Sequence, residues 1–210
     1  RTTNRGHTFL VTTLGQGGKG AFALNISGID HITKKPVGLD SAKDQWATNV
    51  PLWDTSSGEF GYAANGSSSL GYILGKPVIG RIAIQRDNKI PILRQNVKYA
   101  VVIPSGIDGD KNINELEQES GPTLYIYDAL GIDVGTNATN VHDRKPGALI
   151  KKVTYQIPEH KKSEFRYINS LSEPTMLDLD RDGVMDIGYV GDLNGNLYRI
   201  DLRGNNPTSW

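Results

Sequence analysis

The segment Gly191-Asp-Leu-Asn-Gly-Asn-Leu-Tyr-Arg-Ile-Asp201 decides the fold, because the chain repeats it. It aligns with Gly15-Gln-Gly-Gly-Lys-Gly-Ala-Phe-Ala-Leu-Asn25, and both combine a glycine-rich turn, alternating apolar residues and a closing Asn or Asp. The strand Leu124-Tyr-Ile-Tyr-Asp128 is a third copy of the last part. Alternation with a period of two predicts half-buried β-strands. The repeating unit is therefore a set of short antiparallel strands.

A second repeated element extends this unit, since Gly75-Lys-Pro-Val-Ile79 matches Ser172-Glu-Pro-Thr-Met176. Three to four short antiparallel strands per unit are typical of a β-propeller blade. We predict an all-β chain, a modified β-propeller of about two and a half blades. The boundaries are a partial blade at 1–57, a blade at 75–157 and a partial blade at 171–210. Because a closed ring needs about four to eight blades, we expect further blades of the same protein as partners.

The β-type pattern covers nine segments, and helices are few. Strands are expected over residues 7–14, 20–27, 76–84, 98–103, 124–128, 149–157, 174–179, 186–190 and 196–202. Only residues 41–47 and 113–120 have patterns that would support a short helix.

Composition excludes several classes of protein. The 23 Lys and Arg residues balance the 23 Asp and Glu residues, which argues against a strongly electrostatic nucleic-acid binder. There is no cysteine, so disulfides and thiolate metal sites are ruled out. No run approaches the roughly 20 apolar residues of a membrane helix, and we expect no transmembrane segment.

The sharpest motif is Asp178-Leu-Asp-Arg-Asp-Gly-Val-Met-Asp186, which places carboxylates at positions 1, 3, 5 and 9 and glycine at position 6. This is the first three-quarters of an EF-hand calcium loop, although Tyr189 replaces the usual glutamate at position 12. The alternative, a solvated acidic turn, is disfavoured by the repulsion among crowded carboxylates. We therefore expect Ca²⁺ as the cofactor. The expected ligands are Asp178, Asp180, Asp182, Asp186 and the backbone carbonyl of Val184.

A weaker echo of this loop occurs in the second blade, where an isoleucine, Ile113, stands in the place of the glycine. A polar loop is the favoured interpretation there. Its candidate ligands are Asp108, Asp110, Asn112, Asn114 and Glu119. The sequence contains no recognisable pairing of a nucleophile with a general base, so we predict no enzymatic activity, no catalytic residues and no residues for an organic cofactor.

Three segments together resemble the C-terminal β-propeller domain of the PilC/PilY-type proteins of type IV pili: Gly15 to Asn25, Leu70 to Ile79, and Pro174 to Leu202. The resemblance implies an exported protein at the outer membrane and pilus tip. It implies partners among the pilus subunits, including minor pilins, and among host or surface receptors. The implied role is to support pilus extension against retraction and to mediate attachment. The family's calcium ligands carry over to the Asp178 to Asp186 loop.

Two other kinds of propeller remain open. The strand Gly195-Asn-Leu-Tyr-Arg-Ile-Asp201 is also similar to blade strands of quinone-dependent dehydrogenases, but no segment matches the tryptophan-docking motif of those enzymes. A generic integrin-like calcium-binding surface propeller would repeat its calcium loop in several blades. Only one strong copy is visible here.

Overall fold

The computed structural model describes residues 8–28, 50–55, 70–86, 96–107, 121–133, 146–164 and 170–210. Within these ranges the chain consists of β-strands, connecting turns and three short 3-10 helices. The helices are η1 (Gly15–Gly17), η5 (Glu159–Glu164) and η6 (Pro207–Ser209). None of the helices described is long and apolar enough to cross a membrane. The short helices expected at 41–47 and 113–120 lie outside the described residues.

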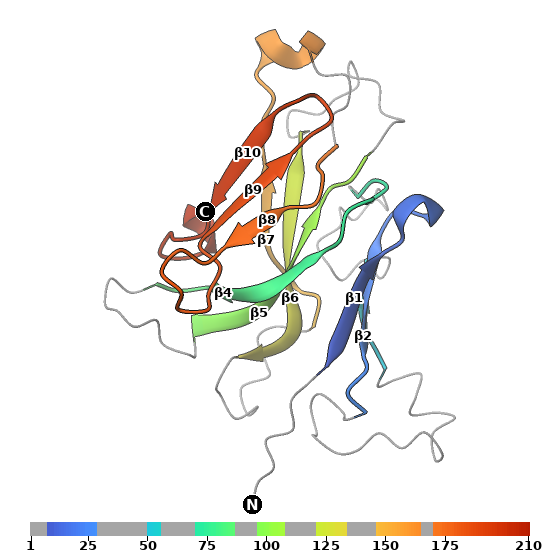
Figure 1. Cartoon of the computed structure of the whole chain (residues 1–210), viewed down its shortest axis with the longest axis vertical. Coiled ribbons are helices and arrows are strands. Elements are labelled where there is room, and N and C mark those ends of the chain that lie inside the picture. Colours follow the sequence, from blue (N-terminus) through green and yellow to red (C-terminus); the bar gives the residue numbers. More distant parts are fainter. Residues whose placement is uncertain are drawn as a thin grey trace, which may run out of the picture.

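The described strands form three antiparallel sheets (Figure 1). The first sheet contains, in order, β1 (Phe9–Thr13), β2 (Ala21–Asn25) and β3 (Pro51–Asp54). The second contains, in order, β4 (Val78–Ala83), β5 (Val97–Pro104), β6 (Thr123–Asp133) and β7 (Leu149–Thr154). The third contains β8 (Thr175–Leu177), β9 (Ile187–Gly191) and β10 (Leu197–Asp201), with β9 in the centre. Each sheet is an up-and-down set of neighbours in sequence, as in a propeller blade.

The residues Gly191-Asp-Leu-Asn-Gly-Asn196 form the turn between β9 and β10, and their hydrogen bonds explain why these residue types occur there. The Asp192 carboxylate accepts hydrogen bonds from the backbone N–H groups of Asn194 and Asn196, at 2.9 and 2.8 Å, and from the Tyr198 hydroxyl at 2.7 Å. Partial burial opposes ionisation of Asp192, but the hydrogen bonds from Asn196, Tyr198 and Asn194 outweigh it and lower the pKa of Asp192. One ionised side chain thus holds the whole turn in place.

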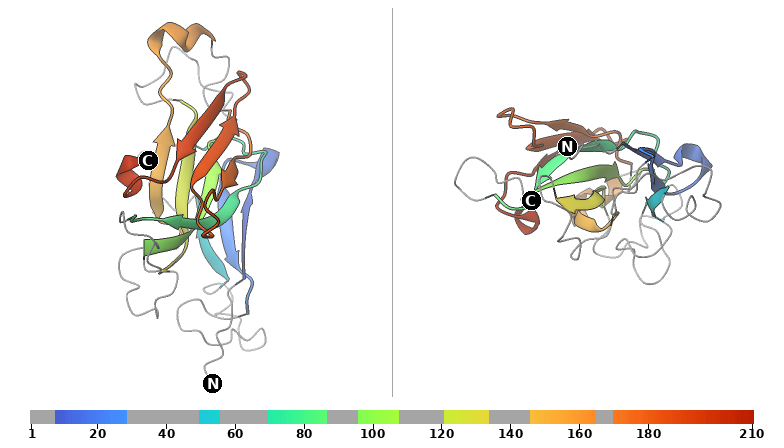
Figure 2. Two further views of the ribbon diagram at one scale, coloured as in Figure 1. Left: turned by 60° about the vertical axis from the view of Figure 1, so that its left-hand side comes forward. Right: turned by 90° about the horizontal axis from the view of Figure 1, so that it is seen from below.

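The central strands of the four-stranded sheet, β5 and β6, are largely buried on both faces, and the other two sheets lie on either side of them (Figure 2). Successive residues of a strand point to opposite faces, and β5 and β6 are apolar on both. One face joins the first sheet in a cluster that includes Val11, Ala23 and Trp53 with Val101, Ile103, Tyr125 and Tyr127. The other joins the third sheet in a cluster that includes Ala100, Val102, Leu124 and Ile126 with Met185, Val190 and Ile200.

Trp53 of β3 connects the first two sheets. Its indole N–H donates a hydrogen bond to the backbone carbonyl of Ala129, at 3.2 Å, and its ring centroid lies 5.7 Å from that of Tyr127. A buried indole needs such a partner for its N–H group. The short strand that carries Trp53 was not among the expected strands, because four residues beginning with Pro51 give too little alternation to read.

The two-sided burial predicts unequal effects for two isoleucines of the second sheet. Ile126→Ala, at a fully buried position, is expected to lower the free energy of unfolding by about 2–5 kcal/mol. Ile79→Ala, at a position that is 43% exposed, is expected to cost less than about 1 kcal/mol. Urea denaturation of the two variants measures the difference, and equal losses would contradict the stacking described here.

Candidate metal centre

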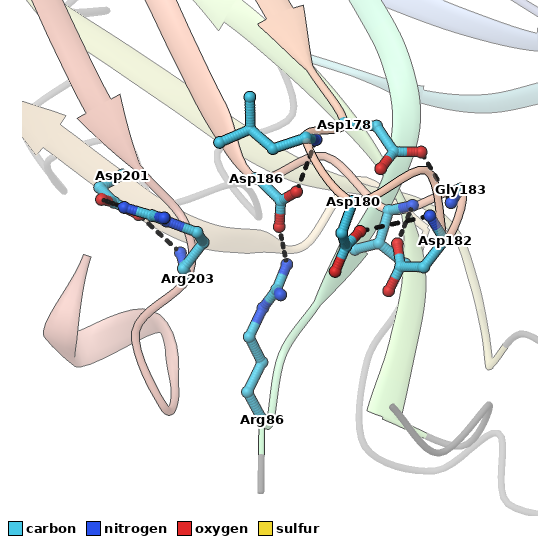
Figure 3. A network of polar contacts seen from close by, with 10 residues as sticks. Arg86, Asp178, Asp180, Asp182, Gly183, Asp186, Asp201 and Arg203 are labelled. Carbon is cyan, nitrogen blue, oxygen red and sulfur yellow. Dashed lines mark hydrogen bonds and ion pairs between the residues drawn. The ribbon is translucent and has the colours of Figure 1, made fainter. Parts of the chain in front are cut away.

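The Asp178 to Asp186 loop connects β8 to β9 and projects from the end of this pair. The strands are in register at Leu177 and Ile187. The Asp186 N–H donates to the Leu177 carbonyl at 2.8 Å, which extends the pairing to the loop's last residue. The loop therefore begins and ends at adjacent positions, and its carboxylates are brought together (Figure 3).

Hydrogen bonds from the loop's own backbone to its carboxylates shape the turn. The Asp182 N–H donates to Asp180 Oδ1 at 3.2 Å, and the Val184 N–H donates to Asp182 Oδ1 at 2.8 Å. Across the loop, the Gly183 N–H donates to Asp178 Oδ2 at 2.7 Å. Short side chains that accept from nearby N–H groups favour tight turns, so the odd spacing of the aspartates itself folds the loop.

The backbone conformation at position 6 of the loop favours Gly183. Its φ is +85°, in the region that glycine adopts without steric cost. The guanidinium of Arg81, which reaches over the loop from β4, lies close to Gly183, and the end of this long side chain could move aside for a larger residue. Arg181, with φ of 63°, is the single non-glycine residue with positive φ in the described part of the chain. The sharp bend is thus concentrated between positions 4 and 6 of the loop.

Three of the expected ligands form a compact group. Oxygen atoms of Asp178, Asp180 and Asp186, one from each carboxylate, all lie within 4.8 Å of one another. Calcium–oxygen distances of 2.3–2.6 Å place opposite ligands of one ion up to about 5 Å apart. Asp178 Oδ1 is buried and has no hydrogen-bond partner among the described residues. Such an atom requires a partner, so the donor set fits a hard cation.

The other two expected ligands, the Asp182 side chain and the Val184 carbonyl, are not part of the group formed by the other three carboxylates. Asp182 is outside that group of three, and one of its oxygens already accepts from Val184. Partial desolvation raises the pKa of Asp182, and the neighbouring carboxylates of Asp180, Asp178 and Asp186 raise it further, against the hydrogen bond from Val184 that lowers it. Val184 is buried. The weaker candidate loop, residues 108–120, lies outside the described residues.

Asp186 is the buried member of the group, and it has two partners. Its Oδ2 accepts from the Leu179 N–H at 2.8 Å, and its Oδ1 lies 2.7 Å from Nη2 of Arg86. The exposed fractions of the two side chains in this ion pair are 13% for Arg86 and 3% for Asp186. Figure 3 shows the Arg86 guanidinium pointing at Asp186 from the segment that follows β4.

Sequence reasoning missed Arg81 and Arg86. Arg86 is 100 residues from Asp186 in the chain, and no local pattern joins the two positions. The only available signal was the repeat itself, because adjacent blades must pack together.

The comparisons with known proteins agree with this architecture. The family model for the PilY1 beta-propeller domain matches residues 2–209. The chain belongs to the PilY1 β-propeller family. The expected family and the expected propeller fold are thereby confirmed.

Type IV pilus biogenesis factor PilY1 of Pseudomonas aeruginosa strain UCBPP-PA14 is 30% identical over 95% of this chain. The PilY1 homolog of Xylella fastidiosa strain Temecula1 is 24% identical over 96%. The chain spans 12% and 10% of the lengths of these two relatives. The crystal structure of the P. aeruginosa PilY1 C-terminal domain is similar in fold, with a TM-score of 0.54 and 24% identity, covering 97% of this chain and 31% of that one.

The raised pKa of Asp182 predicts how stability depends on pH in metal-free buffer. The folded state holds this proton more strongly than the unfolded chain, whose pKa is near 3.8. Ionised Asp182 therefore destabilises the fold at neutral pH, and this penalty is relieved as the pH falls through the raised pKa. Asp182→Asn keeps the acceptor for Val184 and is expected to be more stable than wild type at pH 7, by less than about 1 kcal/mol because the side chain is exposed.

Thermal unfolding in chelator between pH 7 and pH 4 measures this effect. The advantage of Asp182→Asn should shrink towards the acidic end. An advantage that grows as the pH falls would contradict the assignment.

Proposed function

We propose that this chain is a calcium-binding propeller domain of a type IV pilus biogenesis protein. The observation that carries the proposal is the group of three carboxylates within 4.8 Å, one of which has a buried oxygen without a partner among the described residues. Membership of the PilY1 β-propeller family supports the pilus assignment.

The side chains of Asp178, Asp180 and Asp186 would hold the ion, with the Asp182 side chain and the Val184 carbonyl as the remaining proposed ligands. Ca²⁺ suits this loop better than Mg²⁺ because it accepts six to eight oxygen ligands in irregular geometry, whereas Mg²⁺ requires a near-ideal octahedron. The ion supplies positive charge that cancels repulsion among the carboxylates. It performs no redox or acid–base step, so its proposed role is structural.

The relatives' name, type IV pilus biogenesis factor, suggests the cellular setting. We place the parent protein outside the cytoplasm, at the outer membrane and pilus tip. Its proposed partners are pilus subunits, including minor pilins, and receptors on host cells or other surfaces. A propeller stiffened by calcium would support pilus extension against retraction and present a stable surface for attachment. The domain acts by binding and not by catalysis.

The family match favours this function over the two alternatives. A quinone-dependent dehydrogenase propeller would bind a quinone and oxidise alcohols with an added dye. A generic integrin-like surface propeller would bind calcium without any effect on pili. Assays for bound quinone and for pili therefore separate the three functions.

Substitution of Asp178 tests the calcium site directly. Asp178→Asn keeps an oxygen that can accept from the Gly183 N–H, so the turn is preserved, but it removes one charged ligand. Wild type is expected to show a higher Tm in millimolar calcium than in chelator, since a ligand that binds only the folded state stabilises it. Asp178→Asn is expected to bind calcium at least about tenfold more weakly. Isothermal titration and scanning calorimetry measure both quantities.

Asp54→Asn is the matched control, because Asp54 is an exposed carboxylate at the end of β3 in the first sheet. It should respond to calcium as wild type does. An Asp178→Asn variant with an unchanged calcium response would remove this loop as the site. Asp178→Asn in the full-length protein should reduce pilus number and twitching motility. Normal piliation of this variant would show that the calcium site is not needed for the pilus role.

A further inference from the structure

The Asp178 to Asp186 loop is contacted by the neighbouring blade, through β4 and the segment that follows it. Arg86 contacts the segments next to β9 and β10 with both its side chain and its backbone. The guanidinium lies 2.7 Å from Asp186, and the backbone N–H donates to the carbonyl of Asn205 at 2.9 Å. Arg81 adds two contacts: its carbonyl accepts from the Met185 N–H at 2.8 Å, and its guanidinium lies over Gly183.

A further cation, Arg203, lies near Asp186 but pairs with another carboxylate. Its guanidinium pairs with Asp201 at 2.6 Å, and both groups are exposed to solvent. The hydrogen bond to Asp201 raises the pKa of Arg203 most, and the charge of Asp186 adds a smaller effect. Arg86 is thus the cation in direct contact with the buried carboxylate of the loop, within the described part of the chain.

We propose that Arg86 sets the calcium affinity of the loop and couples calcium binding to the junction between the second and third blades. In the calcium-free protein its guanidinium neutralises Asp186 and holds the two blades together. Calcium binds the same group of carboxylates against this positive charge. The inference rests on the proposed function, because it requires that the loop binds calcium.

Coulomb's law gives the direction and the size of the effect. Two cations that share one carboxylate lie roughly 5 Å apart, and at that distance a unit charge weakens the binding of a divalent ion about tenfold even in a water-like dielectric. Arg86 should therefore stabilise the calcium-free protein and lower its calcium affinity. If Arg86 merely positioned Asp186 as a ligand, its removal would weaken calcium binding, so the two roles predict opposite signs.

Arg86→Gln removes the charge and keeps a polar side chain at this position. Arg199→Gln is the matched control, because Arg199 is an exposed residue of β10 that pairs with Asp201. Arg86→Lys retains the charge. Calcium affinity is measured on the 210-residue chain by competition with a chromophoric chelator, and Tm is measured in chelator and in calcium.

Arg86→Gln is expected to bind calcium about tenfold more tightly than wild type. It should also show a lower Tm in chelator and a larger rise in Tm with calcium, while Arg199→Gln matches wild type. Equal or weaker binding by Arg86→Gln would overturn the proposal. If Arg86→Gln unfolds in chelator, the calcium affinity of Arg86→Lys provides the test. An affinity within about twofold of wild type supports a charge effect. A change of about tenfold in either direction overturns the proposal.

Calcium titration of the wild type distinguishes a failure of the proposed calcium function from a failure of the role of Arg86. Wild type that does not bind calcium would overturn the proposed function and this inference with it. Wild type that binds calcium, together with Arg86→Gln that binds no more tightly, would overturn the role of Arg86 alone.

Discussion

The burial of β5 and β6 on both faces of the four-stranded sheet is the constraint on which the rest of the structure depends. β5 and β6 are apolar on both sides, and such strands are stable only between two partners. One partner is the sheet that carries Trp53, and the other is the sheet that carries Val190. Because the third sheet must lie against β4 to β7, its β8–β9 loop is brought to the end of β4, where Arg81 and Arg86 reach it.

This placement makes the acidic loop unfavourable to fold without a cation and puts it where a cation could stabilise the contact between two blades. Folding brings carboxylates within 4.8 Å of one another, and repulsion between them opposes folding. Backbone N–H groups and the Arg86 guanidinium offset part of the repulsion in the metal-free protein. A bound cation would offset more of it, at the boundary between two blades. The proposed calcium site would in this way stabilise a blade junction rather than a single turn.

Much of this was predictable from the sequence, and the failures have a common cause. The repeated glycine-rich turn and alternating strand predicted the all-β propeller, and the spacing of the aspartates predicted where the candidate site lies, because both signals are local. The pairing of Arg86 with Asp186 joins residues 100 apart, and only the packing of blades creates it. β6 extends to Asp133, well beyond the expected end at Asp128, and sequence alternation gives no sign of the extension.

Amide hydrogen exchange, followed by NMR in chelator and in calcium, tests most directly whether calcium stabilises the junction between the blades. Calcium is expected to slow exchange of the Met185 amide, which bonds to Arg81 of the neighbouring blade, by at least about tenfold. The Thr55 amide, which bonds to Ala21 within the first sheet, should keep its rate. An unchanged rate at Met185, or equal slowing at both amides, would contradict the account.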